Sequence, residues 1–185
     1  MRETKNMSEE DLIVLALAVV ARDLSLARKM VNFAKDGVLE EGEMQEKLKL
    51  PPTELRQLLY RMQDSNLVVQ LGTKEDEAGN RLTYWRINSD LAKSFLLRRF
   101  KEVREMLIRR KEEESSGEYY VCAADPTHIR LSFDEVISRM DESGLVCPVC
   151  GAMLEPVDRE KILEEIERML GVLNRALESL EGEAS

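Results

Sequence analysis

Cys147-Pro148-Val149-Cys150-Gly151 forms a C-P-x-C-G knuckle near the C-terminal end of this 185-residue chain. Two thiolates separated by two residues on a tight turn can bind one tetrahedral metal ion, and the glycine lets the backbone fold back. The third and last cysteine, Cys122, lies a short way upstream. Because all the cysteines fall in one stretch, this part of the chain is a candidate metal site.

A complete zinc ribbon takes a second pair of cysteines, of which only Cys122 is present. His128, the single histidine, follows shortly after. Structural zinc takes four sulfur or nitrogen ligands, so we predict a zinc site of Cys122, His128, Cys147 and Cys150. Asp125 is the alternative fourth ligand, and a ribbon without metal is the remaining alternative. A disulfide would leave one cysteine unpaired, and nothing in the sequence indicates secretion.

The length suits one or two small domains, and the net charge of −9 is unevenly distributed. Residues 91–111 carry 8 Lys and Arg against 2 acidic residues, whereas residues 112–185 carry 6 against 18. An acidic chain is a poor general binder of nucleic acid, although its basic segment can make a local contact. The apolar run from Leu12 to Ala21 is too short for a membrane span and lacks the basic flank of a signal peptide. We therefore expect a cytoplasmic protein without a membrane partner.

The first 90 residues open with helical segments. Ser8 is a candidate N-cap, since three acidic residues follow it, and the apolar run after them predicts a helix buried on several sides. The helical pattern continues over residues 25–34, with Gly37 as a plausible C-cap. The fold class that we predict for the whole chain is mainly α with small β elements.

A helix-turn-helix and a wing follow. Residues 42–48 predict a short helix, and Pro51-Pro52 begins a second helix that runs to about Ser65. Two strand-like segments, residues 67–71 and 81–87, enclose a polar turn. Together these elements predict a winged helix-turn-helix domain over residues 1–90.

The second helix of this motif carries Arg56 and Arg61, but Glu54 and Asp64 flank them, and Glu75-Asp76-Glu77 forms the wing tip. Readers of DNA bases need surrounding cations for the phosphates, so docking on a protein is favoured. Adjacent strand residues face opposite ways, so one of Tyr84 and Trp85 belongs to the core. The candidate contact residues on the wing, with a protein partner or DNA, are Tyr84, Trp85 and Arg81.

Residues 91–117 are a basic helical linker, with a helix expected from Asp90 to about Glu114. The apolar residues of this helix, spaced four and three apart, form one narrow stripe. Contact with nucleic acid or an acidic protein surface and a solvated linker are both open interpretations. The basic residues singled out as candidate contacts are Arg98, Arg99 and Arg104.

Residues 118–157 predict a zinc-ribbon-like module, in which strand-like segments such as 119–122 and 129–133 lead to and from the cysteines. Such a small module gains much of its stability from the metal. Residues 158–185 predict an acidic amphipathic helix that Asp158 caps. Its heptad seam must bury against the linker helix or a partner subunit. The seam residues are Ile162, Ile166, Met169, Leu173, Ala176 and Leu180.

The order of these parts resembles archaeal transcription factor E, the counterpart of the large subunit of the eukaryotic general transcription factor IIE. The resemblance rests on Tyr119-Tyr120-Val121-Cys122, on the segment from Ile129 to Glu135, on the knuckle, and on Tyr84-Trp85-Arg86-Ile87 of the wing. The usual ribbon of that family has four cysteines. This chain departs from it, because the second cysteine is absent and Thr127 falls near the lost position.

The resemblance implies a basal transcription initiation factor and no enzyme. It implies binding to the clamp and stalk of RNA polymerase in the preinitiation complex, beside the TATA-binding protein complex and the melted promoter DNA. It also implies promoter opening and open-complex stability without sequence-specific DNA reading, and it allows a second factor subunit. The alternative is a winged-helix DNA-binding regulator with a metal- or redox-sensing C-terminal part. A metalloenzyme is disfavoured, because one histidine leaves little room for an open catalytic site.

Overall fold

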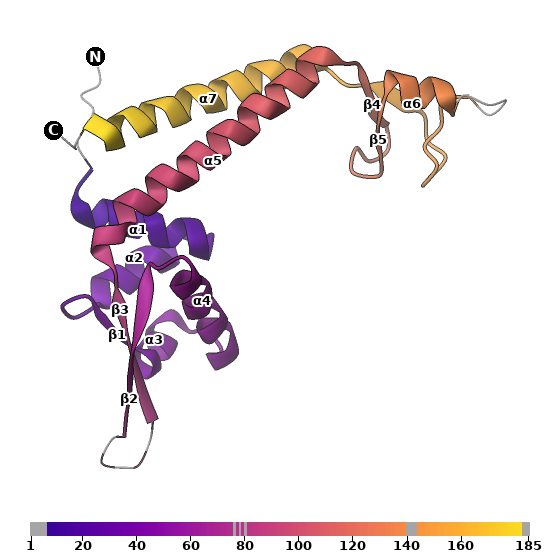
Figure 1. The fold of residues 1–185 in the computed structure, drawn as a ribbon. Coiled ribbons are helices and arrows are strands. Elements are labelled where there is room, and N and C mark those ends of the chain that lie inside the picture. The colour runs from indigo at the N-terminus through magenta and orange to yellow at the C-terminus, as the bar shows by residue number, and fades with distance from the viewer. Residues whose placement is uncertain (1–6, 76, 78, 80, 140–143, 183–185) are drawn as a thin grey trace. The chain divides into compact units, whose positions relative to one another are not determined.

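The computed structural model describes residues 7–75, 77, 79, 81–139 and 144–182. The chain divides into two compact units, Met1–Phe100 with Ser179–Ser185, and Lys101–Glu178. Helices predominate, and each unit holds one small three-stranded sheet (Figure 1). This confirms the predicted fold class. None of the described helices combines the length and the apolar character that crossing a membrane requires.

Four helices build most of the first unit: α1 (Glu9–Ala21), α2 (Leu24–Phe33), α3 (Glu41–Leu48) and α4 (Pro52–Asp64). Ser8 caps α1 as predicted, because its hydroxyl accepts a 3.1 Å hydrogen bond from the backbone N–H of Asp11. Helices α1 and α2 are not continuous. Arg22 adopts a left-handed conformation with φ of 59°, and the Asp23 carboxylate then caps α2 at the N–H of Leu26.

The sheet of the first unit contains β1 (Val38–Glu40), β2 (Val68–Glu75) and β3 (Arg81–Ile87), all antiparallel in the order β1-β3-β2. The β2–β3 hairpin is the predicted wing (Figure 1). Strand β1 was not predicted. Gly37 is not a helix C-cap, since Ala34 ends α2 and Gly37, with φ of +75°, leads into β1. Asp76 of the predicted wing tip lies outside the described residues.

Trp85 belongs to the core of the first unit, and this corrects its prediction as a contact residue. Its side chain is 1% exposed, opposite Leu39 on β1 and edge-on to the ring of Tyr60 at 6.0 Å. Tyr84 faces the other way and is half-buried, with the ammonium of Lys74 5.7 Å from its ring. Tyr84 therefore remains the candidate contact.

Helix α5 (Ser89–Ser116) begins in the first unit, where Ala92, Phe95 and Leu96 join the core. The second unit contains β4 (Tyr119–Cys122), β5 (Arg130–Ser132), α6 (Phe133–Ser138), β6 (Leu154–Pro156) and most of α7 (Arg159–Gly182). Its strands are antiparallel in the order β5-β4-β6. The predicted strand over 129–133 is shorter, because the capping box of Ser132 and Glu135 starts α6 at Phe133.

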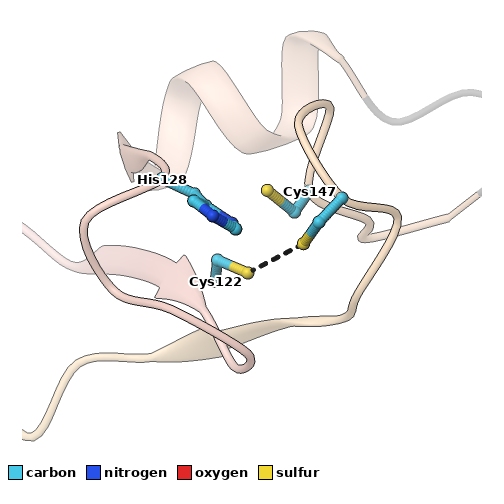
Figure 2. Close-up of side chains that lie close together, drawn as sticks. Cys122, His128 and Cys147 are labelled. Atoms are coloured by element: carbon cyan, nitrogen blue, oxygen red, sulfur yellow. Dashed lines mark hydrogen bonds between the residues drawn. The ribbon is translucent and has the colours of Figure 1, made fainter.

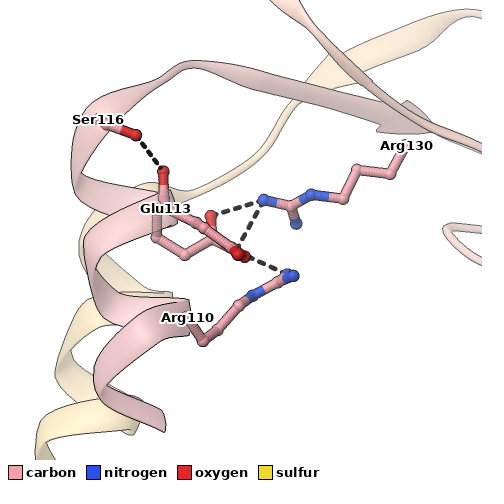
Figure 3. A network of polar contacts seen from close by, with 5 residues as sticks. Arg110, Glu113, Ser116 and Arg130 are labelled. Carbon is pink, nitrogen blue, oxygen red and sulfur yellow. Dashed lines mark hydrogen bonds and ion pairs between the residues drawn. The ribbon is translucent and has the colours of Figure 1, made fainter. Parts of the chain in front are cut away.

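A buried carboxylate joins the end of α5 to the ribbon sheet. Glu114 is 1% exposed and forms ion pairs of 2.6 Å with Arg110, one turn earlier on α5, and with Arg130 on β5 (Figure 3). The Arg130 guanidinium also lies 4.1 Å from the ring centroid of Tyr119. Nothing in the acidic run of residues 112–114 distinguished Glu114 from its neighbours. The side chain of Arg159 on α7 donates to the carbonyl of Ser115 at 2.8 Å.

Candidate metal centre

The predicted ligands converge from separate segments of the second unit. Cys122 ends β4, His128 lies on the loop between β4 and β5, and Cys147 and Cys150 form the knuckle (Figure 2). Their candidate ligand atoms all lie within 4.8 Å of one another. The sulfurs of Cys122 and Cys150 are 3.4 Å apart, and the three cysteines are free. The four residues selected from the sequence are therefore the group that the structure brings together.

The knuckle is a tight hairpin. The N–H of Cys147 donates to the carbonyl of Ala152 at 2.7 Å, and the N–H of Gly151 donates to the carbonyl of Cys147 at 2.8 Å. Gly151 has φ of +75°, in the left-handed region that side chains disfavour. This is the backbone reversal expected from the glycine of the motif. The N–H of Ala123, the residue after Cys122, donates a 2.9 Å hydrogen bond to the carbonyl of Met153 and so joins β4 to the hairpin.

The loop that carries His128 is held by Asp125. The carboxylate of Asp125 accepts from the N–H of Thr127 at 2.9 Å and from its hydroxyl at 2.7 Å, and the Asp125 carbonyl accepts from the N–H of His128 at 3.1 Å. The second carboxylate oxygen lies 3.8 Å from Nε2 of His128. The hydrogen bonds from Thr127, the backbone one first, hold the pKa of Asp125 below its usual value.

The thiols at the centre differ in their electrostatics. The pKa of Cys122 is lowered, chiefly because the backbone N–H of Asp125 donates to its sulfur. The pKa of Cys150 is raised. The backbone N–H of Ala152 lowers this pKa, but the neighbouring sulfurs of Cys122 and Cys147 and the partial loss of solvation together outweigh that effect. The surroundings of Cys122 thus favour the thiolate, which is the form that binds metals.

These residues fit a metal ion in two respects. The edges of a tetrahedral zinc–thiolate site are roughly 3.8 Å, as follows from Zn–S bonds of about 2.3 Å, and the sulfurs of Cys122 and Cys150 already lie close to that separation. In addition, Nδ1 of His128 is buried and has no hydrogen-bond partner among the described residues. A buried, unpaired imidazole nitrogen is costly, and a metal ion would satisfy it. The four side chains can therefore hold one metal ion.

Comparison with known proteins gives the family. The model of the TFIIE alpha subunit matches residues 17–116. The chain belongs to the TFIIE alpha family. It is also 30% identical over 176 residues to transcription factor E of Sulfurisphaera tokodaii, with 92% of each chain covered.

Two further relatives of this basal transcription factor family extend the likeness. Transcription factor E of Metallosphaera sedula is 33% identical, with 71% of this chain and 72% of the relative covered. That of Pyrococcus horikoshii is 31% identical, with 74% and 69% covered. A possible transcriptional regulator from Methanosarcina mazei aligns in structure with a TM-score of 0.36 at 14% identity, over 59% of this chain and 93% of that one, which is too distant to support an inference. As a member of this family the chain is a basal transcription initiation factor.

The other site residues predicted for this TFIIE alpha family member are distributed over two elements. Arg81 is exposed at the start of β3, opposite Glu75 on β2. Arg98, Arg99 and Arg104 lie on α5, and the Arg98 guanidinium lies 5.9 Å from the ring centroid of Phe95. These residues remain predicted contacts.

Proposed function

We propose that this chain binds RNA polymerase at its clamp and stalk within the preinitiation complex, beside the TATA-binding protein complex, and promotes promoter opening. Its winged helix is proposed to dock on protein, while the wing and the basic part of α5 contact melted promoter DNA without reading its sequence. Family membership supports the role in initiation. The charge distribution on the helix-turn-helix supports protein docking, as follows.

Arg56, near the start of α4, the second helix of the helix-turn-helix, forms an ion pair with another residue of this chain. Nε of Arg56 on α4 lies 2.5 Å from the carboxylate of Glu41 on α3, and this hydrogen bond raises the pKa of Arg56. Glu54, in the first turn of α4, adds a further negative charge. Each phosphate contact of a DNA-binding protein takes a cation that is available to the backbone. This pairing is the single structural observation that most favours a protein partner for α4.

Promoter opening requires no chemistry from this chain. A factor that binds an open clamp more tightly than a closed one shifts the polymerase population by the difference in binding free energy. A tenfold preference corresponds to about 1.4 kcal/mol. A second factor subunit is a further proposed partner. The candidate surface for it is the half-buried part of the α7 seam, since Ile166 and Leu180 of that seam are buried; the half-buried residues are Ile162, Met169, Leu173 and Ala176.

We further propose that the metal is zinc. Three sulfurs and one imidazole are a donor set that zinc accepts in structural sites, with all four positions closed by protein. Cys122, His128, Cys147 and Cys150 would hold it, and its role would be to stabilise the ribbon. Metal analysis of purified protein should give one zinc per chain. His128→Ala should weaken zinc retention, whereas retention at the wild-type level would contradict the role of His128.

Co-purification tests the proposed function. Tagged full-length chain should retain RNA polymerase from an extract of its source. Arg56→Ala should lower that retention, because the Arg56 side chain is 57% exposed despite its pairing with Glu41 and lies on the proposed docking surface of α4. A chain that ignores polymerase would contradict the proposal. A gel shift on duplex promoter DNA without polymerase distinguishes the operator-binding regulator, since only that alternative predicts a sequence-dependent shift.

A further inference from the structure

Asp125, an acidic residue on the loop between Cys122 and His128, is not one of the four proposed metal ligands but lies beside two of them. Asp125 interacts with two of the proposed ligands, Cys122 at the end of β4 and His128 on the loop that follows. Its backbone N–H donates to the sulfur of Cys122, and its carboxylate lies 3.8 Å from Nε2 of His128. We propose that Asp125 is a positioning residue that orients His128 so that Nδ1, and not Nε2, binds the metal. This rests on the proposed metal site.

The two nitrogens of His128 have different surroundings. Nδ1 is buried and has no hydrogen-bond partner in the described part of the chain, whereas Nε2 lies beside the Asp125 carboxylate. A neutral imidazole carries its proton on one nitrogen and a lone pair on the other. The negative carboxylate favours the proton on Nε2, which leaves the lone pair of Nδ1 for the metal. A separation of 3.8 Å is longer than a hydrogen bond, but this electrostatic preference does not depend on a formed bond.

The carboxylate is itself fixed in place. Its first oxygen accepts two hydrogen bonds from Thr127, so its second oxygen is the one left for Nε2. Ligating histidines commonly give their other N–H to a carboxylate, which sets the tautomer and raises the ligand's basicity. In this chain the loop thus provides both an imidazole ligand and the group that orients it. Asp125, the alternative fourth ligand in the sequence, acts instead through His128.

The substitution Asp125→Asn isolates this role. Asparagine retains an oxygen for Thr127, so the turn is kept, and the backbone N–H to Cys122 is unchanged. Its amide nitrogen would then face Nε2, which puts two donors against each other. Losing such a partner of a ligand typically weakens metal binding about 10- to 100-fold. Asp134→Asn, in the exposed first turn of α6 of the same unit, removes the same charge and serves as the control.

Two measurements on the full chain test the inference. In Zn²⁺-loaded protein the single histidine gives an unambiguous long-range ¹H–¹⁵N spectrum, which should show metal on Nδ1 and a proton on Nε2. In competition with a chelator, Asp125→Asn should bind Zn²⁺ at least about tenfold more weakly than Asp134→Asn. The visible absorption spectrum of Co²⁺-loaded Asp125→Asn should match that of the wild type, because the four ligands are unchanged.

The contrary outcomes are distinct. Metal on Nε2, or equal affinities of the two variants, would overturn the positioning role while leaving the metal site intact. A changed Co²⁺ donor set in Asp125→Asn, with none in His128→Ala, would make Asp125 the ligand. Wild-type protein that takes up neither Zn²⁺ nor Co²⁺ would overturn the metal site itself, and the positioning role with it.

Discussion

Nη2 of Arg130 lies 2.7 Å from one carboxylate oxygen of Glu114 and 2.6 Å from the other. Glu114 lies in the last turn of α5, and Arg130 begins β5, so this pair connects the basic helix directly to the ribbon sheet. The carboxylate is buried and also pairs with Arg110. A buried charge is tolerated only when it is paired and hydrogen-bonded, so the joint between helix and ribbon depends on both arginines.

Arg130→Met should therefore destabilise the second unit. It removes two charge-assisted hydrogen bonds while Arg110 still partners the buried carboxylate, so we expect a loss of about 1–3 kcal/mol. Hydrogen exchange of the backbone amides of β4 and β5 measures this loss. Arg168→Met is the control, because Arg168 and its partner Glu165 are 65% and 54% exposed. Solvent screens such an exposed pair, so its loss should have little effect on stability. Equal effects of the two substitutions would contradict the importance of burial.

Tyr84 and Trp85 should separate function from stability. Trp85→Ala empties a core position and should cost about 3–5 kcal/mol in the first unit, measured by denaturant unfolding followed by circular dichroism. Tyr84→Ala, on the half-buried face, should cost about 1 kcal/mol or less. If Tyr84 contacts polymerase or DNA as proposed, its variant should also lower open-complex yield in a permanganate footprint. Wild-type yield would remove Tyr84 from the contact set, and wild-type stability of Trp85→Ala would contradict its core position.

The same two residues show how far the sequence could determine the structure. Strand alternation required one of them to be buried but could not say which, since that depends on which face of β3 the helices cover. The helices were easier, because Ser8, Pro52 and Asp158 are local signals that act within one turn. Strand β1 has only three residues and pairs with β3, which is far away in the sequence, so no local sequence pattern predicted it.

The cluster of Cys122, His128, Cys147 and Cys150 was predictable because the motif is local and histidine occurs once. The choice between His128 and Asp125 was not, since both lie on the same loop at usable spacing. It depends on the position of each side chain. The structure groups His128 with the three cysteines, and its buried Nδ1 has no hydrogen-bond partner among the described residues, which supports His128 as the proposed ligand. Glu114 was missed for a related reason. Glu114 can be buried because Arg110 on α5 and Arg130 on β5 both pair with it, and the pairing with β5 depends on the tertiary structure.

Metal removal should affect the second unit alone. Among the described residues, the buried cluster of its ribbon holds Cys122, Leu131, Val136, Cys147 and Leu154, so two of the cluster's members are proposed ligands. A core this small depends on its metal for stability. Treating Zn²⁺-loaded protein with a chelator should abolish slow hydrogen exchange in β4 and β5 but leave α1 and α4 protected. Added zinc should restore protection. Unchanged exchange after verified zinc removal would mean that the ribbon folds without metal.

Two glycines of the second unit should respond to alanine with opposite signs. Gly151 in the knuckle has φ of +75°. Apart from Gly151 and its two chain neighbours, no described atom lies within 4 Å of the position that a β-carbon would take, so the cost of Gly151→Ala is conformational. A left-handed alanine costs about 1–2 kcal/mol, which should weaken zinc binding roughly 5- to 30-fold in a chelator competition. Gly171 lies inside α7, where the nearest atom to such a carbon is Nη1 of Arg175 at 3.6 Å.

Gly171→Ala should instead stabilise α7 by about 0.5–1 kcal/mol, because glycine loses more backbone entropy in a helix than alanine does. It should leave zinc affinity unchanged, which makes it the matched control for Gly151→Ala. Helix stability is measured by hydrogen exchange along α7, and affinity by the same competition. If Gly151→Ala binds zinc as tightly as Gly171→Ala does, the left-handed turn at the knuckle is not what holds Cys147 and Cys150 in place.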